Sequence, residues 1–130
     1  MADFRFENLE VWKMATEIGH RLYDLAEDLE AKGHQEHASS FRTHSCLISS
    51  ILAEGSNCPT KGEFALFVSQ ARSAALRVAN SILFLAGREL ISEAEESELI
   101  NMLKRESKML DNFRQSLERA ERSNEAIVQA

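Results

Sequence analysis

The stretch ISSILAEGSNCPTKGEFALF, residues 48–67, separates two helical patterns and decides the fold. Apolar residues at helical spacing lead into Gly55, and glycine commonly ends a helix because its backbone is free of side-chain clashes. The Ser-Asn-Cys-Pro run that follows is typical of a loop. Thr60 and Glu63 then form a T-x-x-E capping box, which marks the start of a helix. We therefore expect a helix on each side of a short loop.

One helix is predicted over about residues 9–31, with Asn8 as its N-cap and Gly33 as its stop. Its apolar residues recur at spacings of three and four, which places them on one face. They are Val11, Ala15, Ile18, Leu22, Leu25 and Leu29. A second stripe lies beside the first at about 100° per residue and consists of Trp12, Gly19 and Tyr23. An isolated bundle does not need that second stripe.

Three more helices are predicted over about residues 34–54, 60–89 and 92–122. In the third, apolar residues cover most of the circumference, so some of them point away from the core. The residues off the core face are Leu66, Leu76, Leu83 and Phe84. In a single bundle nothing would cover that side of the helix.

Four helices with short connections and no strand pattern predict an all-α fold, an up-down-up-down four-helix bundle. The bundle is expected over residues 9–122 as one domain, because 130 residues are too few for two. Residues 1–8 are expected to form an N-terminal arm, in which Phe4 and Phe6 dock onto another surface. Residues 123–130 are expected to form a frayed tail.

The composition is that of an acidic, reduced and soluble protein. The formal net charge of -6 at pH 7 counts against broad contact with phosphate backbones. Cys46 and Cys58 are too few for a disulfide framework and fit no zinc spacing. The sequence has no membrane-spanning apolar run and no signal-peptide pattern at its N-terminus, which predicts a cytoplasmic protein. Because no catalytic motif is found, we expect no enzymatic activity and no cofactor.

Several segments resemble a known family. They are Leu52-Ala53-Glu54-Gly55 with Lys61-Gly62-Glu63-Phe64, Phe6-Glu7-Asn8-Leu9-Glu10-Val11-Trp12-Lys13, Tyr23, and Ala71-Arg72-Ser73. On these residues, and over nearly its whole length, the chain resembles the bacterial four-helix-bundle proteins named after 23S rRNA intervening sequences. That family resembles in fold the accessory subunit of diversity-generating retroelements, a basic homopentamer that engages nucleic acid and a reverse transcriptase. The resemblance implies that this chain forms a homopentameric ring of bundles.

The chain departs from the family's usual residues at three places. An arginine pair in the second helix reads Arg42-Thr43, the usual asparagine before the I-A-E-G run is Ile51, and a common glutamate of the third helix is Arg77. Together with the acidic total, these departures count against RNA binding. The fold that the resemblance implies is not affected by them.

A buried polar layer is predicted near the middle of the bundle. Glu106 occupies a slot in the apolar stripe of the fourth helix, and His44 lies on the inner stripe of the second. Because these helices would run parallel across the bundle, the two side chains could form a hydrogen-bonded pair, with Arg72 or Arg77 nearby. Such a layer either fixes the packing or marks a metal or ligand site. Isolated core histidines favour the first alternative, so no metal site is expected.

Charged residues give the two ends of the predicted bundle different characters. One end is acidic and collects Glu27, Asp28, Glu30, Glu36, Glu89, Glu93, Glu95, Glu96 and Glu98. In a ring of similarly oriented protomers this end forms an acidic rim, which is either a solvated cluster or a docking surface for a basic protein partner. The other end is mixed, and its basic residues would be the contacts in a nucleic-acid-binding interpretation. These are Arg5, Lys13, Lys61, Arg119 and Arg122.

The sequence therefore favours a non-enzymatic, homo-oligomeric scaffold or adaptor that binds another macromolecule. The expected oligomer interface consists of Trp12, Gly19, Tyr23, Leu66, Leu76, Leu83 and Phe84. Aromatic residues beside a small residue are typical of such interfaces. The alternative is a nucleic-acid-binding, and specifically RNA-binding, accessory protein. A third hypothesis, a bundle that binds a small molecule or a metal, depends on the His44–Glu106 layer alone.

Overall fold

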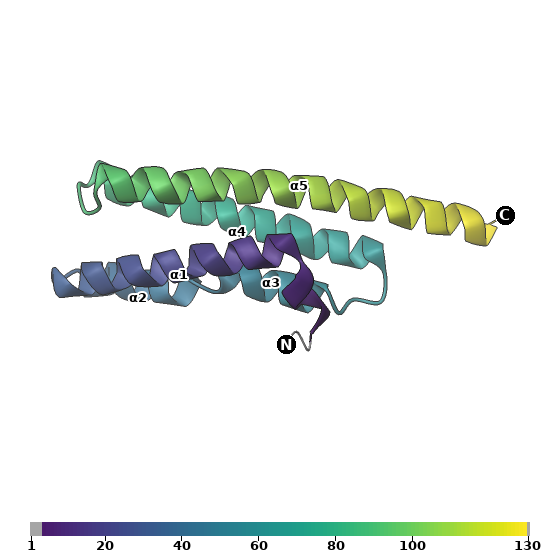
Figure 1. The fold of residues 1–130 in the computed structure, drawn as a ribbon, viewed down its shortest axis with the longest axis horizontal. Coiled ribbons are helices and arrows are strands. Elements are labelled where there is room, and N and C mark those ends of the chain that lie inside the picture. The colour runs from purple at the N-terminus through teal and green to yellow at the C-terminus, as the bar shows by residue number, and fades with distance from the viewer. Residues whose placement is uncertain (1–3, 130) are drawn as a thin grey trace.

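The computed structural model describes residues 4–129, with the side chains of residues 4–125. The elements in chain order are η1 (Arg5–Asn8), α1 (Glu10–Ala31), α2 (Gln35–His44), α3 (Leu47–Gly55), α4 (Lys61–Gly87) and α5 (Glu93–Gln129). Residues 4–129 contain no strand, so the chain is all-helical, as predicted. Figure 1 shows the helices lying side by side along one long axis as a bundle, with α5 projecting beyond the others at its C-terminal end. Within the described residues, no helix is both long enough and apolar enough to cross a membrane.

The second predicted helix is broken, which corrects the continuous helix expected over residues 34–54. The break falls at Ser45 and Cys46, between α2 and α3. The hydroxyl of Ser45 donates a hydrogen bond to the carbonyl of Arg42 at 2.7 Å, and this local bond competes with the regular helical ladder. Residues Ser45 and Gly19 also pack backbone to backbone, because a Cβ added at Gly19 would lie only 2.1 Å from the Ser45 carbonyl oxygen. The break therefore coincides with a close contact to α1, which residue spacing does not reveal.

The core is built from the apolar stripes that the sequence predicts. On α1 the buried residues include Val11, Ala15, Ile18, Leu22, Leu25 and Leu29. On α4 they include Phe64, Val68, Ala71, Ala75, Val78, Ile82 and Leu85, and on α5 Leu99, Leu103, Leu110 and Leu117. Helices α4 and α5 run in opposite directions, since a short connection joins Gly87 to Glu93 and Gly62 at the start of α4 lies against Glu121 far along α5. Burial of these stripes supplies the main driving force for folding.

The predicted N-cap is confirmed for α4, a capping box also starts α5, and the N-cap predicted for α1 is wrong. The Thr60 hydroxyl accepts a hydrogen bond from the Glu63 backbone N–H at 3.1 Å. Ser92 and Glu95 form the reciprocal pair at α5, with distances of 3.1 Å and 2.9 Å. At α1 the predicted N-cap, Asn8, lies instead inside η1, and Leu9 occupies the cap position without a side-chain bond.

Helix α5 continues to Gln129, beyond the end near Arg122 that the sequence suggested. From residue 93 onward the sequence contains neither glycine nor proline, so nothing in the backbone stops the helix. The segment expected to form a frayed tail is therefore helical through Gln129. Of the two terminal segments, residues 1–3 and Ala130 lie outside the described residues.

Candidate functional site

The middle of the bundle holds a buried carboxyl group on α5. Glu106 has no exposed surface, as its place in the apolar stripe predicts. Its neighbours on α5, Leu103 and Ser107, line a groove together with Ala75 of α4, so Glu106 lies at the height of the buried alanines of that helix. These are Ala71, Ala74 and Ala75. Glu106 therefore lies on the buried side of α5, near the level of these alanines.

The prediction that His44 forms a hydrogen-bonded pair with Glu106 is wrong. His44 is exposed at the end of α2, and its Nδ1 lies 3.4 Å from the hydroxyl oxygen of Ser40. Phe41 before the break and Ile48 after it are both buried, whereas His44, the last residue of α2, lies on the surface. The His44–Glu106 layer does not exist, and the small-molecule or metal hypothesis that depended on it is not supported.

Glu106 has no hydrogen-bond partner among the described residues for either carboxylate oxygen. Burial raises the pKa of this carboxyl from 4.5 to about 8, because the charged form loses the solvation of water and gains no cation in return. At neutral pH the group is therefore mostly protonated. The hydroxyl of Thr16, on α1, is also buried and unbonded in the described part of the chain.

The outer face of α4 carries the apolar residues that the sequence placed away from the core. Leu66, Leu76, Leu83 and Phe84 are all at least half exposed, and we call these four residues the α4 ridge. The segment from Phe64 to Gly87 contains two arginines and no acidic residue, although the whole chain carries a charge of -6. This combination distinguishes α4 from the charged outer surfaces of α1 and α5.

A groove of about 470 Å³ separates the α4 ridge from α5. Its apolar lining includes Leu76, Leu83 and Ile100. Three basic residues also line the α4–α5 groove, namely Arg72, Lys104 and Lys108, and they face one acidic residue, Asp111. The Nε atom of Arg72 is buried without a hydrogen bond among the described residues. The groove is thus an apolar surface with a cationic rim.

The other residues of the predicted interface have different environments. Gly19 is buried inside the chain against Ser45, so its assignment to a contact between copies is wrong. Trp12 is half-buried, and its ring lies 5.3 Å from that of Phe6. Tyr23 is exposed, with the guanidinium carbon of Arg42 5.7 Å above its ring. Of the three residues of this second stripe, Tyr23 is the most accessible.

The structure brings together several of the predicted nucleic-acid contacts. Lys61 begins α4 beside Gly62, whose neighbour on α5 is Glu121, so the exposed Arg119 and Arg122 lie at the same end. Arg5 bonds the Ser56 carbonyl in the adjacent loop, and Lys13 pairs with Glu10 at 3.4 Å. Two of these five residues are thus already engaged within the chain.

The acidic end is partly neutralised. Glu98 pairs with Arg21 at 3.2 Å, and Glu30 pairs with Arg42 at 2.7 Å. Glu95 is used in its capping box. Within the described residues no group of three or more His, Cys, Asp and Glu side chains could hold a metal ion.

A family model described as 23S rRNA-intervening sequence protein matches residues 7–112. The match covers most of the chain and includes α1 to α4 and the part of α5 that contains Glu106. The chain belongs to this family. Searches of curated proteins and of solved structures found no match.

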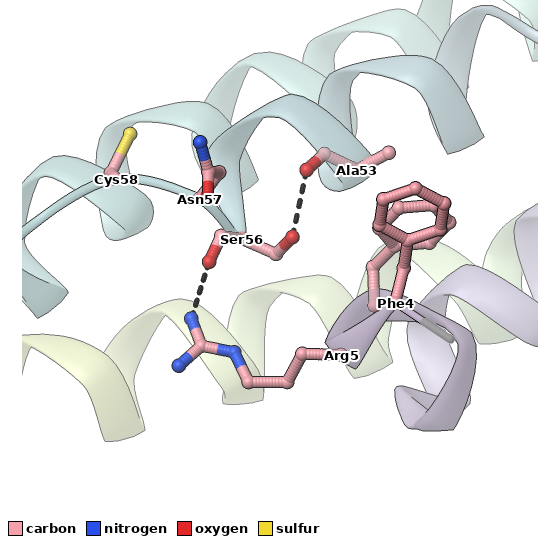
Figure 2. Close-up of a pocket in the computed structure, with 7 residues that line it drawn as sticks. Phe4, Arg5, Ala53, Ser56, Asn57 and Cys58 are labelled. Atoms are coloured by element: carbon pink, nitrogen blue, oxygen red, sulfur yellow. Dashed lines mark hydrogen bonds between the residues drawn. The ribbon is translucent and has the colours of Figure 1, made fainter. Parts of the chain in front are cut away.

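Two further features of the chain include residues beyond the ends of the region that the family model matches. The first is an open cavity of about 610 Å³ between the N-terminal arm and the α3–α4 loop, shown in Figure 2. Phe4 and Arg5 line one side, and Ser56 and Cys58 line the other. Phe6 packs against Trp12 of α1 at 5.3 Å, so the docking predicted for the arm is confirmed for Phe6, while Phe4, which stacks on Phe6 at 5.3 Å, stays exposed. Sequence reasoning missed the cavity because it depends on where the arm folds back.

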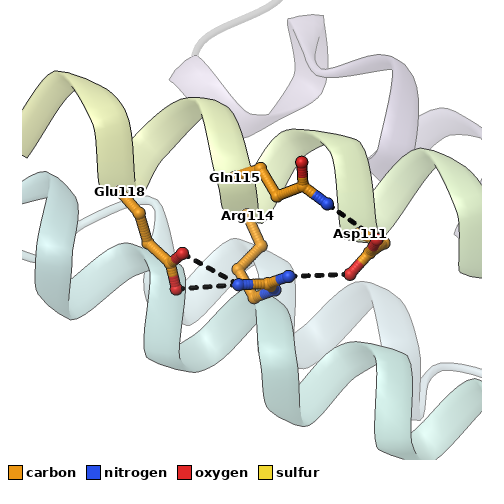
Figure 3. Close-up of polar contacts among 4 residues, drawn as sticks. All are labelled: Asp111, Arg114, Gln115 and Glu118. Carbon is orange, nitrogen blue, oxygen red and sulfur yellow. Dashed lines mark hydrogen bonds and ion pairs between the residues drawn. The ribbon is translucent and has the colours of Figure 1, made fainter.

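The second feature is a charged cluster on α5, shown in Figure 3. Arg114 donates to Glu118 at 2.9 Å and 2.8 Å and to Asp111 at 2.8 Å, and Gln115 donates to Asp111 at 2.9 Å. Hydrogen bonding to Arg114 lowers the pKa of the Asp111 carboxyl. The spacing of three and four residues could have revealed this cluster from the sequence.

Proposed function

We propose that the protein is a non-enzymatic, homo-oligomeric scaffold or adaptor in the cytoplasm that binds another macromolecule. In this proposal up-down-up-down bundles assemble into a five-membered ring. The observation that carries it is the α4 ridge, four exposed apolar side chains on a helical segment without a carboxylate. Leaving apolar surface in water costs about 25 cal/mol per Å², so a second copy that covers the ridge is favoured.

A closed ring needs two different surfaces that fit each other. The α4 ridge with the α4–α5 groove is one such surface, with the cations Arg72, Lys104 and Lys108 at its rim. The outer side of α1 suits it, because Tyr23 is exposed there together with Asp24 and Glu27. We propose that α1 of one copy packs against the α4 ridge of the next. The acidic ends then form a rim that a basic protein partner could bind.

Light scattering on a size-exclusion column, with absorbance at two wavelengths, tests the proposal. A ring of five chains has a mass of about 73 kDa, five times 14.7 kDa. Replacing Leu76 and Leu83 together by Glu should reduce the mass to that of one chain without loss of helical circular dichroism. Ser116→Glu, an exposed position on α5, is the control and should keep the ring. A single-chain mass for the wild type would overturn the proposal.

The alternative is an RNA-binding accessory protein. The description of its family, 23S rRNA-intervening sequence protein, and the shared end of Lys61, Arg119 and Arg122 favour this alternative. Binding through phosphates weakens steeply with salt. Co-elution of nucleic acid, and salt-dependent binding to structured RNA that a triple Lys61, Arg119 and Arg122 to Gln variant loses, would support it over the scaffold.

A further inference from the structure

A second groove lies on the other flank of α4, between α4 and α2. Two adjoining cavities of about 130 Å³ and 150 Å³ open there, and Ser40, Phe41 and Ser81 line both of them. Phe41 is buried and forms an apolar floor between two serine hydroxyls. We call this continuous hollow the α2–α4 groove. Along α2 it extends from His37 to His44, about 10 Å of helix.

One end of the α2–α4 groove is cationic and lined by polar side chains. Arg77 and His44 line it from opposite helices, with the hydroxyls of Ser40 and Ser81 beside them. The guanidinium group of Arg77 has no ion pair or hydrogen bond within residues 4–125, and the Ser81 hydroxyl donates to the backbone carbonyl of Arg77 at 3.2 Å. The described residues that line the groove include no carboxylate, in a chain with 21 acidic residues. This end therefore suits an anion with several acceptor oxygens.

The other end of the groove combines an aromatic ring with a side-chain amide. Phe84 is 62% exposed and lines it together with Asn80 and His37. An exposed aromatic ring is a stacking surface for a nucleobase. The amide of Asn80 and the imidazole of His37 offer both donors and acceptors for the edge of such a base.

We propose that the α2–α4 groove binds a nucleotide. Its phosphate lies between Arg77 and His44, and its base stacks on Phe84 beside Asn80. Arginine suits phosphate because its planar guanidinium donates two parallel hydrogen bonds. The groove is shallow, so it holds a nucleotide by one side. The chemistry is the same for a free mononucleotide and for one unit of a single-stranded RNA, and the experiment separates these two sources.

The test measures binding of adenosine 5′-monophosphate to the full chain by calorimetry in a phosphate-free buffer. Inorganic phosphate and a fluorescent single-stranded hexaadenylate are measured in parallel. Arg77→Gln should weaken the mononucleotide roughly tenfold to hundredfold, since a hydrogen bond to a charged group contributes about 1.5–3 kcal/mol. Arg105→Gln removes the same charge from an exposed position on α5 and should have no effect.

Phe84→Leu tests the base-binding end of the site separately from its phosphate-binding end. It keeps an apolar residue but removes the stacking surface, so mononucleotide binding should fall about tenfold while phosphate binding stays the same. The RNA is the source if the hexaadenylate binds at least about tenfold more tightly than the mononucleotide, and a free nucleotide is the source otherwise. No mononucleotide or hexaadenylate binding by the wild type, equal effects of Arg77→Gln and Arg105→Gln, or equal affinities for phosphate and mononucleotide would each overturn the assignment.

The site shares Phe84 with the α4 ridge, whereas the residues of its phosphate end are not part of the proposed ring contact. Leu76 and Leu83 face the α4–α5 groove, whereas Arg77 and Ser81 face α2. Binding is therefore measured also on the double Leu76 and Leu83 to Glu variant. Retained binding by single chains supports a site within one chain, and loss of binding by a folded single chain would overturn it.

Discussion

The centre of the bundle and the α4 ridge depart from the usual distribution of side chains in opposite ways. At the centre an acidic residue, Glu106, has no exposed surface and no hydrogen-bond partner among the described residues. On the ridge, large apolar residues such as Leu66 and Phe84 are more than 60% exposed. Both arrangements cost free energy in a single chain, one through a desolvated carboxyl and the other through solvated hydrocarbon.

The two regions differ in how that cost can be removed. At the centre, protonation reduces the cost, because the raised pKa of Glu106 keeps its carboxyl neutral. On the ridge, the cost of exposed apolar surface is reduced only when another surface covers it. Changes at the centre should therefore alter folding, while changes on the ridge should alter assembly.

The largest effect is expected from a comparison of two adjacent residues of α4, one on its buried face and the other on its exposed side. Ile82 is fully buried, and Leu83 is 50% exposed. Ile82→Ser removes buried hydrocarbon and adds a buried hydroxyl, so it should lower the free energy of unfolding by about 4 kcal/mol. Leu83→Ser should lower it by less than about 1 kcal/mol in single chains and should weaken the ring. Urea unfolding, together with light scattering, checks both. Equal losses of stability would show that the two faces of α4 are not distinct.

The next effect is a pH dependence that comes from Glu106. The folded pKa of about 8 lies above the unfolded value of 4.5, so the proton stabilises the folded chain fully below about pH 4.5, and this stability is lost as the pH rises through about 8. Glu106→Leu should abolish this loss and stabilise the protein at pH 7 by about 3 kcal/mol.

Urea unfolding at several pH values between about 5 and 8 measures this dependence. Glu125→Gln removes an exposed carboxyl from the same helix and is the control, which should keep the wild-type dependence. If Glu106→Leu and the wild type lost stability in parallel over this range, Glu106 would not be the group responsible.

A smaller effect is expected where α1 touches the break in the second helix. Gly19→Ala places a methyl group 2.1 Å from the Ser45 carbonyl oxygen, which the backbone must move to avoid. The variant should lose about 2–3 kcal/mol of stability. Gly87→Ala makes the same chemical change in open space at the end of α4, and it should be neutral or slightly stabilising. A tolerated Gly19→Ala would mean that α2 and α3 can separate from α1 at this point.

The sequence predicts best those features that depend on periodicity. The stripes of α1 and α4 are buried as expected, and so is Glu106, because each helix has one face toward the core. The exposed α4 ridge follows from the same helical periodicity. These are local regularities that a single chain carries in its spacing.

Features that depend on contact between distant segments could not be predicted. The break at Ser45 and Cys46 lies where Gly19 of α1 approaches, and His44 at the end of α2 is exposed rather than paired with Glu106. The two grooves beside α4 depend on the distances between helices, which residue spacing does not determine. The sequence anticipated Arg77 near His44, but in a buried layer with Glu106, whereas the structure places both residues on the exposed α2–α4 groove.

The smallest of these effects concerns the start of α4, the helix that carries both the buried face and the ridge. The Thr60 hydroxyl accepts a hydrogen bond from the Glu63 N–H at 3.1 Å, so Thr60→Ala leaves that donor without its partner and should cost about 1 kcal/mol. Thr43→Ala is the matched change inside α2, where the exposed hydroxyl bonds back to the Ser39 carbonyl at 3.0 Å. Alanine is the better helix former there, so this variant should be neutral or slightly more stable in urea unfolding. A loss of equal size in the two variants would show that removal of any threonine hydroxyl is costly, and the stability of α4 could then not be attributed to its cap.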